Sequence, residues 1–261
     1  REPEVVIPRI EKVVGHSDFR LDWVSVYTFQ CRRLERFVHG RIVFAGDSAH
    51  IVSPFGARGG NGGLQDVDNL GWKLAAVLKG EAPESLLESY DRERVFGADE
   101  NILNSARTTK FMTPSDGAER LFRDQVLALA ETAEFARPMV NGGRLSVPCV
   151  YPMPGAPDDG RLPRASRPGA VAPDAPMGNG WLLNALGGRV VLLALGTEAP
   201  EVPGLEVLAP DVNATLFRRY VGAAPHALYL IRPDQVVGAR WVDADAAEVA
   251  AALARIREGA A

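Results

Sequence analysis

The feature that most constrains the fold of this chain is a short apolar run followed by a glycine-rich loop and a long helical segment. Residues 41–45 are apolar and typical of a strand, and Gly46 ends them. The loop 51–61 is rich in glycine, so its backbone can bend sharply and approach a ligand closely. The spacing predicts a helix over 62–79, ended by Gly80. Its expected apolar face is Leu64, Val67, Leu70, Leu74 and Val77.

A helix that begins under such a loop suits an anionic or electron-rich ligand. Its first N–H groups have no partner within the helix, and its N-terminus carries partial positive charge. Donors held in that arrangement bind anions and stabilise negative charge where it develops. A strand, turn and helix with no ligand is the structural alternative. So many glycines in one turn favour the ligand site.

The spacing of the motif resembles the second flavin-binding motif of the FAD-dependent aromatic hydroxylases, the class A flavoprotein monooxygenases. That pattern is G-D-A-A-H, then P, then G-x-G-x-N-x-G, then D and N-L with W-K-L. The matching residues are Gly46, Asp47, Ala49, His50, Pro54, Gly59, Asn61, Gly63, Asp66, Asn69, Leu70, Trp72, Lys73 and Leu74. Two positions depart from it, with Ser48 in place of alanine and Ala57 in place of a glycine.

The resemblance implies roles for single residues. Asp47 would hydrogen-bond a ribityl hydroxyl of FAD, Gly46 would let the backbone pass the pyrophosphate, and Pro54 would lie near the reactive edge of the isoalloxazine. Backbone N–H groups at 60–62 would face the pyrimidine edge of the flavin. The implied cofactor-binding set is Gly46, Asp47, Pro54, Gly59, Gly60, Asn61 and Gly62. No residue is assigned as catalytic, and neither the histidines nor the cysteines have the spacing of a metal site.

The motif that holds the ADP half of FAD is absent from this sequence. Enzymes of this kind bind that half with G-x-G-x-x-G in a βαβ unit, and residues 1–261 contain no such run. The chain also begins with Arg1. We therefore expect a C-terminal portion of a longer protein that holds half of a flavin site. By itself it would bind FAD poorly and oxidise no NAD(P)H.

Composition narrows the class of protein. Of 261 residues 46% are hydrophobic, which supports a folded core, and the net charge of −4 argues against a nucleic-acid surface. No apolar run approaches the length of a membrane span. Cys31 and Cys149 are the only cysteines and imply no disulfide framework. These features predict a cytoplasmic protein without nucleic-acid or membrane partners.

The chain divides into three expected parts of an α/β protein. Residues 1–110 would be the C-terminal part of a para-hydroxybenzoate hydroxylase-like (PHBH-like) FAD-binding and substrate-binding core, and they include a strand at 23–29. Residues 111–180 would be a helix and a proline-rich connector. The elements expected around this boundary are helices over 83–107 and 117–136.

Residues 181–261 are expected to form a separate small α/β domain. Strands are predicted at 189–195 and 205–208, a helix at 211–220, and a hairpin from 227–231 and 236–241. Asp245 and Glu248 have the spacing of a capping box that opens the last helix, whose inner face would be Val249, Leu253 and Ile256. The order is similar to the thioredoxin-like domain that ends phenol hydroxylase relatives. It lacks C-x-x-C, so dithiol exchange is excluded.

Several other polar residues allow more than one role. A hydrolase role for His50 is disfavoured, because Ser48 does not lie in G-x-S-x-G; a structural histidine is expected. Arg32 and Arg33 would form a salt bridge, or else touch substrate or a flavin phosphate. The run 91–94 is expected to be a solvated helix face.

The resemblance and the residues together leave three classes of function open. The first is an FAD-dependent monooxygenase that hydroxylates a small aromatic, phenolic substrate with NAD(P)H and O₂. The second is a non-catalytic fragment or an interaction module, whose tail would support a homodimer. The third is a flavin-dependent halogenase or reductase relative. Flavin absorption in the purified chain separates the first from the second.

Overall fold

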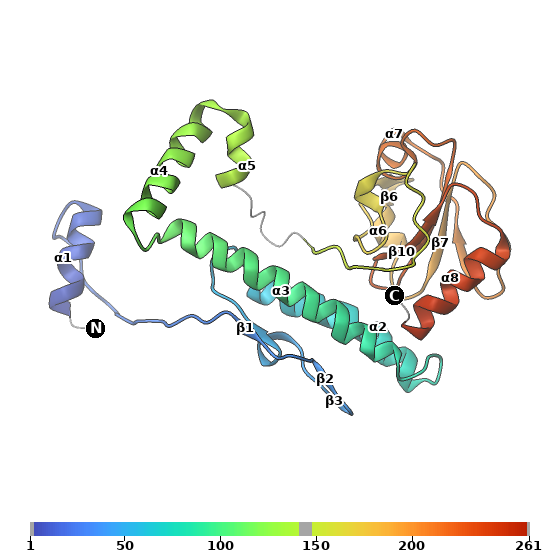
Figure 1. Cartoon of the computed structure of the whole chain (residues 1–261), viewed down its shortest axis with the longest axis horizontal. Helices are drawn as coiled ribbons and strands as arrows, with labels where there is room; N and C mark the ends of the chain where they lie inside the picture. Colours follow the sequence, from blue (N-terminus) through green and yellow to red (C-terminus); the bar gives the residue numbers. More distant parts are fainter. Residues whose placement is uncertain (1–2, 141–147, 260–261) are drawn as a thin grey trace. The chain divides into compact units, whose positions relative to one another are not determined.

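The computed structural model describes residues 3–140 and 148–259, in two units, 1–30 and 31–261 (Figure 1). In the first unit, α1 spans Pro3–Val14 and the residues after it have no regular structure. The expected strand at 23–29 is therefore wrong for this structure. Trp23, Tyr27 and Phe29 are exposed, and no strand among the described residues pairs with the segment 23–29. A strand pattern without a partner leaves its backbone groups to water.

Two small antiparallel pairs open the second unit and position the glycine-rich loop. β1 (Arg32–Arg33) pairs with β4 (His50–Ile51), and β2 (Val38–His39) pairs with β3 (Ile42–Val43). The predicted strand at 41–45 is thus present in shorter form. A 3₁₀ turn at Gly46–Ser48 connects β3 to β4.

Helices α2 (Gly59–Leu78) and α3 (Leu86–Met112) pack against each other (Figure 1). The buried residues of α2 are Gly62, Asp66, Asn69 and Lys73. The expected apolar face of this helix is only partly buried. Leu64 is 70% exposed and Val67 is 62% exposed, whereas Leu70, Leu74 and Val77 are half-buried. The spacing predicts the helix correctly but misses its fully buried polar residues, which ion pairs and hydrogen bonds hold in the interior.

A helical and then mostly irregular segment follows α3. α4 spans Gly117–Thr132 with Asp116 as its N-cap, a 3₁₀ turn covers Glu134–Ala136, and α5 spans Arg137–Val140. From 148 to 175 the described chain has one further 3₁₀ turn, Arg164–Ser166, and no helix or strand. The short strands β5 (Pro176–Met177) and β6 (Gly180–Trp181) pair with each other before α6 (Leu182–Ala185).

A four-stranded sheet in the order β10-β9-β7-β8 forms the C-terminal part. β7 pairs in parallel with β8 and antiparallel with β9, and β9 continues into β10 as a hairpin. These pairings match the predicted strands and hairpin. The bounds are Val191–Leu195 for β7, Glu206–Leu208 for β8, Ala227–Ile231 for β9 and Val237–Trp241 for β10.

Helices cover both faces of this sheet, so alternate residues of its strands enter two cores. Leu193 and Tyr229 pack on one side with Leu216 of α7 (Ala214–Leu216), which continues as a π-helical turn over Phe217–Val221. Leu192 and Leu230 pack on the other side with α8 (Ala246–Glu258). The predicted capping box is present, because Glu248 N–H donates to Asp245 Oδ1 and Asp245 N–H donates to Glu248 Oε2.

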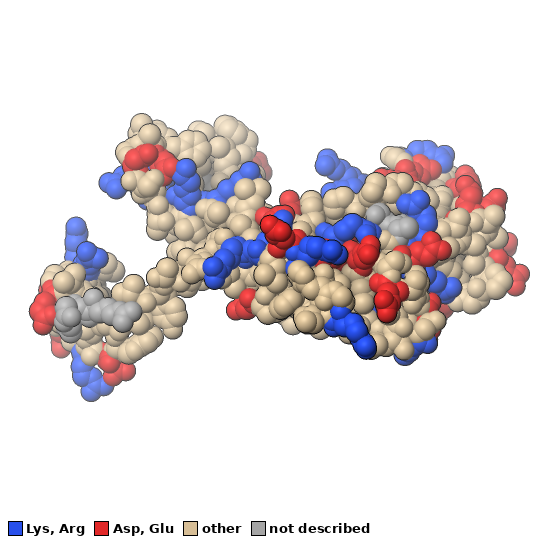
Figure 2. Space-filling model, turned by 60° about the horizontal axis from the view of Figure 1, so that its bottom comes forward, with Lys and Arg blue, Asp and Glu red and all other residues tan. Residues whose placement is uncertain are grey.

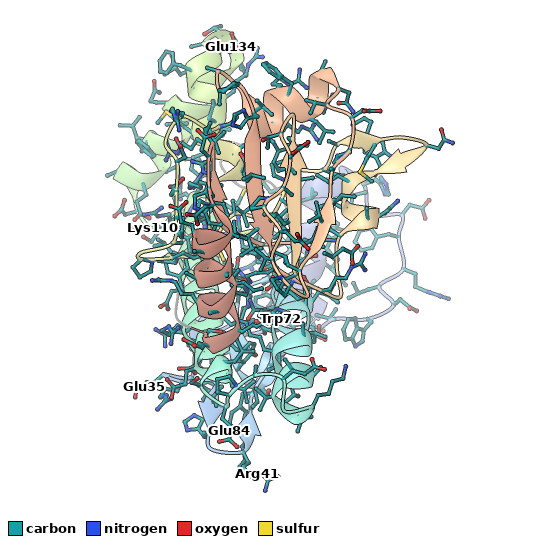
Figure 3. All side chains as sticks on the ribbon, turned by 90° about the vertical axis from the view of Figure 1, so that its right-hand side faces the viewer. Glu35, Arg41, Trp72, Glu84, Lys110 and Glu134 are labelled. Carbon is teal, nitrogen blue, oxygen red and sulfur yellow. The ribbon has the colours of Figure 1, made fainter. Side chains whose placement is uncertain are left out.

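A buried ion network joins this sheet to the two long helices. Arg232, in the hairpin turn, donates to both carboxylate oxygens of Glu93 on α3, at 2.7 and 2.8 Å. Lys73 Nζ lies 2.9 Å from the same carboxylate, and Asp234 accepts from Arg232. Trp72 lies on α2 at this contact (Figure 3), with the Arg232 guanidinium 5.5 Å from its ring centroid. The C-terminal part is therefore fixed to α2 and α3 by paired charges.

Charged side chains alternate in sign on the face drawn in Figure 2 and gather into no basic stripe there. Among the described residues, no group of His, Cys, Asp and Glu has the arrangement of a metal site. The described helices are also too short or too polar to cross a bilayer.

Candidate flavin site

The Gly46 turn presents a free carboxylate at the end of β3. Gly46 has a φ of 59°, in the left-handed region where glycine carries no steric penalty. Ser48 closes the turn, since its Oγ donates to the Ala45 carbonyl at 2.7 Å. Asp47 is exposed, and its side chain has no hydrogen bond or ion pair with any described residue. A carboxylate held on a fixed turn can accept from a ligand hydroxyl.

The N-terminus of α2 lies directly beside this turn. The helix begins at Gly59 rather than Gly62, with Arg58 as its N-cap. Gly62 N–H donates to the Arg58 carbonyl at 2.8 Å and is therefore already used. The N–H groups left for a ligand are those of residues 59–61. Gly62 is expected to be a donor only if the helix begins at residue 62. The helix begins three residues earlier, so the Gly62 N–H is bonded within it.

Glycines let the turn and the helix approach each other closely and leave the backbone accessible at the helix terminus. A Cβ at Gly63 would lie 3.4 Å from the Cα of Gly46, so the two backbones nearly touch. At Gly60 a Cβ would meet no atom within 4 Å, and this residue is exposed. The open side of the helix terminus is therefore at Gly60. Pro54 is exposed on the loop that leads to it.

Ala57 keeps the backbone conformation that the missing glycine favours. Its φ is 50°, in the left-handed region. An alanine there costs about 1 kcal/mol relative to glycine. Ala57 N–H donates to the Pro54 carbonyl at 3.1 Å, which closes the turn. The alanine therefore adds strain to the loop at this position.

Side chains of α3 hold the loop from behind. Ser53 Oγ lies 2.8 Å from both Ser105 Oγ and Thr109 Oγ1, and Ser105 Oγ also donates to the Phe55 carbonyl at 3.3 Å. Arg58 is buried and donates through Nη1 to Asn101 at 3.2 Å. The loop is thus fixed to one face of α3, which presets the geometry of its N–H groups.

Asp66 connects the turn to the helix core. Its Oδ2 accepts from Gly46 N–H at 2.8 Å and lies 2.7 Å from His50 Nε2, and its Oδ1 accepts from Arg94 Nε at 2.6 Å. Burial raises the pKa of Asp66, but the hydrogen bond from His50 and the Arg94 guanidinium outweigh it and hold that pKa below its ordinary value. The carboxylate stays ionised, and His50 is a buried, bonded side chain.

The run 91–94 is a correction to the sequence analysis. Glu93 is only 5% exposed and Arg94 is fully buried, while Asp91 accepts from the backbone N–H groups of Phe37 and Val38. This part of α3 is therefore buried and bonded to neighbouring elements, and it is not the solvated face that the sequence predicts. A usable signal was the small residues at Gly97 and Ala98, which let a neighbouring element approach α3 closely.

Arg33 forms the predicted salt bridge. Its Nε and Nη2 donate to the two oxygens of Asp99 on α3, at 2.6 and 2.8 Å. The guanidinium also donates to the Leu34 carbonyl. The structure therefore supports the salt-bridge interpretation over a contact with substrate or phosphate. Arg32 is exposed on β1.

Comparisons with known proteins agree with this geometry. Residues 1–105 match the family described as "FAD binding domain". A flavin-dependent monooxygenase of Mycobacteroides abscessus is 32% identical in an alignment that covers 90% of this chain and 46% of that protein. The uncharacterized aromatic compound monooxygenase YhjG of Bacillus subtilis is 36% identical over 88% of this chain and 46% of its own length. The chain thus spans about half the length of these relatives.

Solved structures show the same fold. The Diels-Alderase PyrE3 of pyrroindomycin biosynthesis superposes with a TM-score of 0.66 at 28% identity, covering 100% of this chain and 51% of that one. Aklavinone-11 hydroxylase, solved with FAD and aklavinone, gives a TM-score of 0.69 at 24% identity over 98% of this chain and 51% of its own. With the flavin motif and its preset turn, these matches show that the chain belongs to the family of FAD-dependent aromatic hydroxylases.

Proposed function

We propose that this chain holds the ribityl and isoalloxazine part of FAD in a monooxygenase that hydroxylates a small aromatic substrate. The observation that carries the proposal is the preset turn: an unpaired Asp47 carboxylate beside the free N–H groups of residues 59–61. A Cβ at Gly60 would meet no atom within 4 Å, so a ligand can reach the backbone there. The residues present therefore fit a flavin.

Each part of the turn has a proposed task. Asp47 accepts a hydrogen bond from a ribityl hydroxyl, and the bare backbone at Gly46 allows close passage of the pyrophosphate. The N–H groups at the α2 terminus donate to the pyrimidine edge, where a reduced flavin carries negative charge. Pro54 lies at the reactive edge. Bound FAD supplies the redox chemistry, and the chain positions it.

The co-substrates belong to the same proposal. NAD(P)H is the reductant and O₂ the oxidant, and the substrate is phenolic. The name of one relative, 3-(3-hydroxy-phenyl)propionate/3-hydroxycinnamic acid hydroxylase of Mycolicibacterium smegmatis, supports a phenolic substrate, at 37% identity over 48% of this chain. A homodimer remains a prediction.

The C-terminal sheet is proposed to be thioredoxin-like. One parallel pair, β7 with β8, is followed by an antiparallel hairpin and a last helix, which is the strand order of that fold. It departs in the segment between β7 and β8, which contains no helix. The proposed use of this part is structural.

A cyclase is a second candidate. The dialkyldecalin synthase of Streptomyces rugosporus is 35% identical over 84% of this chain and 42% of its own length. Together with the Diels-Alderase PyrE3, it supports a ring-forming reaction on the same scaffold. A fold of this kind hosts more than one chemistry, so the site and not the fold decides.

Oxygen consumption separates the two candidates. The protein that carries this sequence is loaded with FAD and given NADH or NADPH with a panel of phenols. A monooxygenase consumes one O₂ per hydroxylated product, and the product gains one oxygen atom from ¹⁸O₂ by mass spectrometry. Reduced-cofactor oxidation that no phenol accelerates, with no labelled product, contradicts the monooxygenase proposal.

A further inference from the structure

We propose that Tyr151 is a positioning residue for the flavin, although it lies about a hundred residues beyond the glycine-rich loop in sequence. It acts through two buried side chains, Arg94 and Asp66, on the Gly46 turn. The inference rests on the proposed FAD site. It assigns to the proline-rich connector a part in cofactor binding.

The first link is between the turn and Asp66. Asp66 is fully buried, and its Oδ2 accepts from Gly46 N–H at 2.8 Å. That bond fixes the peptide between Ala45 and Gly46, at the start of the turn that carries Asp47. A rotation of the Asp66 carboxylate would therefore move the residue that is proposed to bind the ribityl chain.

The second link is the Arg94 guanidinium, which is used on both of its edges. Nε donates to Asp66 Oδ1 at 2.6 Å, and Nη2 lies 3.3 Å from the Gly62 carbonyl in the first turn of α2. On the other edge, Nη1 donates to Tyr151 Oη at 2.8 Å. An arginine side chain has many rotamers, and a partner on each edge selects one of them.

The third link anchors Tyr151 itself to the C-terminal sheet. Tyr151 N–H donates to the Gly169 carbonyl at 3.0 Å, and Gly169 N–H donates to Val237 of β10 at 2.8 Å. A Cβ at Gly169 would lie 2.0 Å from the Tyr151 carbonyl oxygen, so only glycine permits this crossing. The hydroxyl that holds Arg94 thus has a rigid support in a different part of the fold.

Removal of this hydroxyl isolates the positioning effect. Tyr151→Phe takes away one neutral partner of Arg94 and leaves the Arg94–Asp66 ion pair intact, so no buried charge loses its counter-ion. What changes is the freedom of the guanidinium, and with it the Gly46 peptide and the Gly62 carbonyl. Loss of one such bond is expected to weaken FAD binding about three- to tenfold.

The test measures FAD dissociation constants for the protein that carries this sequence, by flavin fluorescence on titration of the apoprotein. Tyr229→Phe is the matched control. Tyr229 is also buried, and its hydroxyl donates to the Tyr220 carbonyl at 2.6 Å inside the C-terminal core. Both variants lose a buried hydrogen bond and some thermal stability. Only Tyr151→Phe is expected to raise the FAD dissociation constant.

A double-mutant cycle with Arg94→Lys tests the route. Lysine keeps the positive charge beside Asp66 but has no second N–H edge that could donate to Tyr151. Tyr151→Phe should therefore have no further effect on FAD affinity in the Arg94→Lys background. Equal FAD affinities of wild type, Tyr151→Phe and Tyr229→Phe would overturn the inference, as would full additivity in the cycle. A wild-type protein that binds no FAD would overturn the proposed function instead.

Discussion

Asp47 is the residue whose side chain is most directly committed to the proposed ligand. It is exposed on a fixed turn and has no described partner in the protein. Asp47→Ala should weaken FAD binding by about 0.5–1.5 kcal/mol, the net value of one hydrogen bond. Isothermal titration calorimetry on the apoprotein measures this.

Two companion variants make that result specific. Asp47→Asn keeps an acceptor oxygen and should retain part of the affinity. Asp211→Ala removes an exposed carboxylate from the C-terminal part and should have no effect. If Asp47→Ala and Asp211→Ala bind FAD equally well, the role of Asp47 is wrong.

Single residues were predictable where a motif fixed them and unpredictable where only the fold brought them together. The turn at Gly46, the buried His50 and the Arg33 salt bridge agree with expectation. Glu93 and Arg94 were expected on a solvated face, because charged residues at helical spacing usually face water. Their partners are Arg232 and Tyr151, far away in sequence, and no local pattern reports such contacts.

Two glycines of α2 distinguish the effect of a substitution on stability from its effect on FAD binding. Gly60 and Gly71 lie in the same helix without positive φ, and a Cβ at either would meet no atom within 4 Å. Alanine at each should stabilise the protein by about 0.5–1 kcal/mol, because glycine loses more backbone entropy on folding. Gly60→Ala should also weaken FAD binding, since its methyl group enters the space proposed for the flavin.

Urea denaturation of the apoprotein gives the two stabilities, and FAD titration gives the two affinities. Gly71→Ala is the control, with a stability gain of similar size and unchanged affinity. A Gly60→Ala protein that binds FAD as well as Gly71→Ala would show that the flavin lies elsewhere.

The helices and strands show which patterns carry enough information. The capping box, the hairpin and the buried strand β7 were predictable because their signals are local. The strand expected at 23–29 was not observed, since a strand depends on a partner. In α2 the helical period is predictable, but the buried polar residues are not. Lys73 donates to Asn69 in the interior, and Asp66 is bonded to His50 and Arg94.

Across the whole molecule, Glu93 joins the C-terminal sheet to the flavin-site helices. Glu93→Gln would leave Arg232 and Lys73 buried with too little negative charge. Breaking a buried pair in this way costs about 3–5 kcal/mol of unfolding free energy. Glu206→Gln is the matched control, because Glu206 pairs with Arg189 at the surface and that pair is worth about 0–1 kcal/mol. Similar costs for the two variants would contradict the role given to this network.

The same network predicts acid sensitivity. Burial raises the pKa of Glu93, but Arg232 and Lys73 outweigh it and hold that pKa well below its ordinary value. A carboxyl with a depressed folded-state pKa contributes stability above its unfolded pKa, and that stability is lost as the pH falls. The unfolding free energy should decline below about pH 4.5. Glu93→Gln should decline less steeply, although Asp66 still contributes; equal slopes would contradict this.

The ion network also determines how removal of the C-terminal part would affect stability. Deletion of residues 180–261 would remove the part of the chain whose proposed use is structural. The deletion would also remove Arg232 from Glu93. We therefore expect α2 and α3 to lose stability directly, whatever the assembly of the protein.

The position of the flavin tests the account most directly. A crystal structure of the FAD-bound protein that carries this sequence should place the pyrimidine edge within hydrogen-bond distance of the N–H groups of residues 59–61. It should also place a ribityl hydroxyl against the Asp47 carboxylate. A flavin bound elsewhere, with the space at Gly60 still open, would contradict the proposed site.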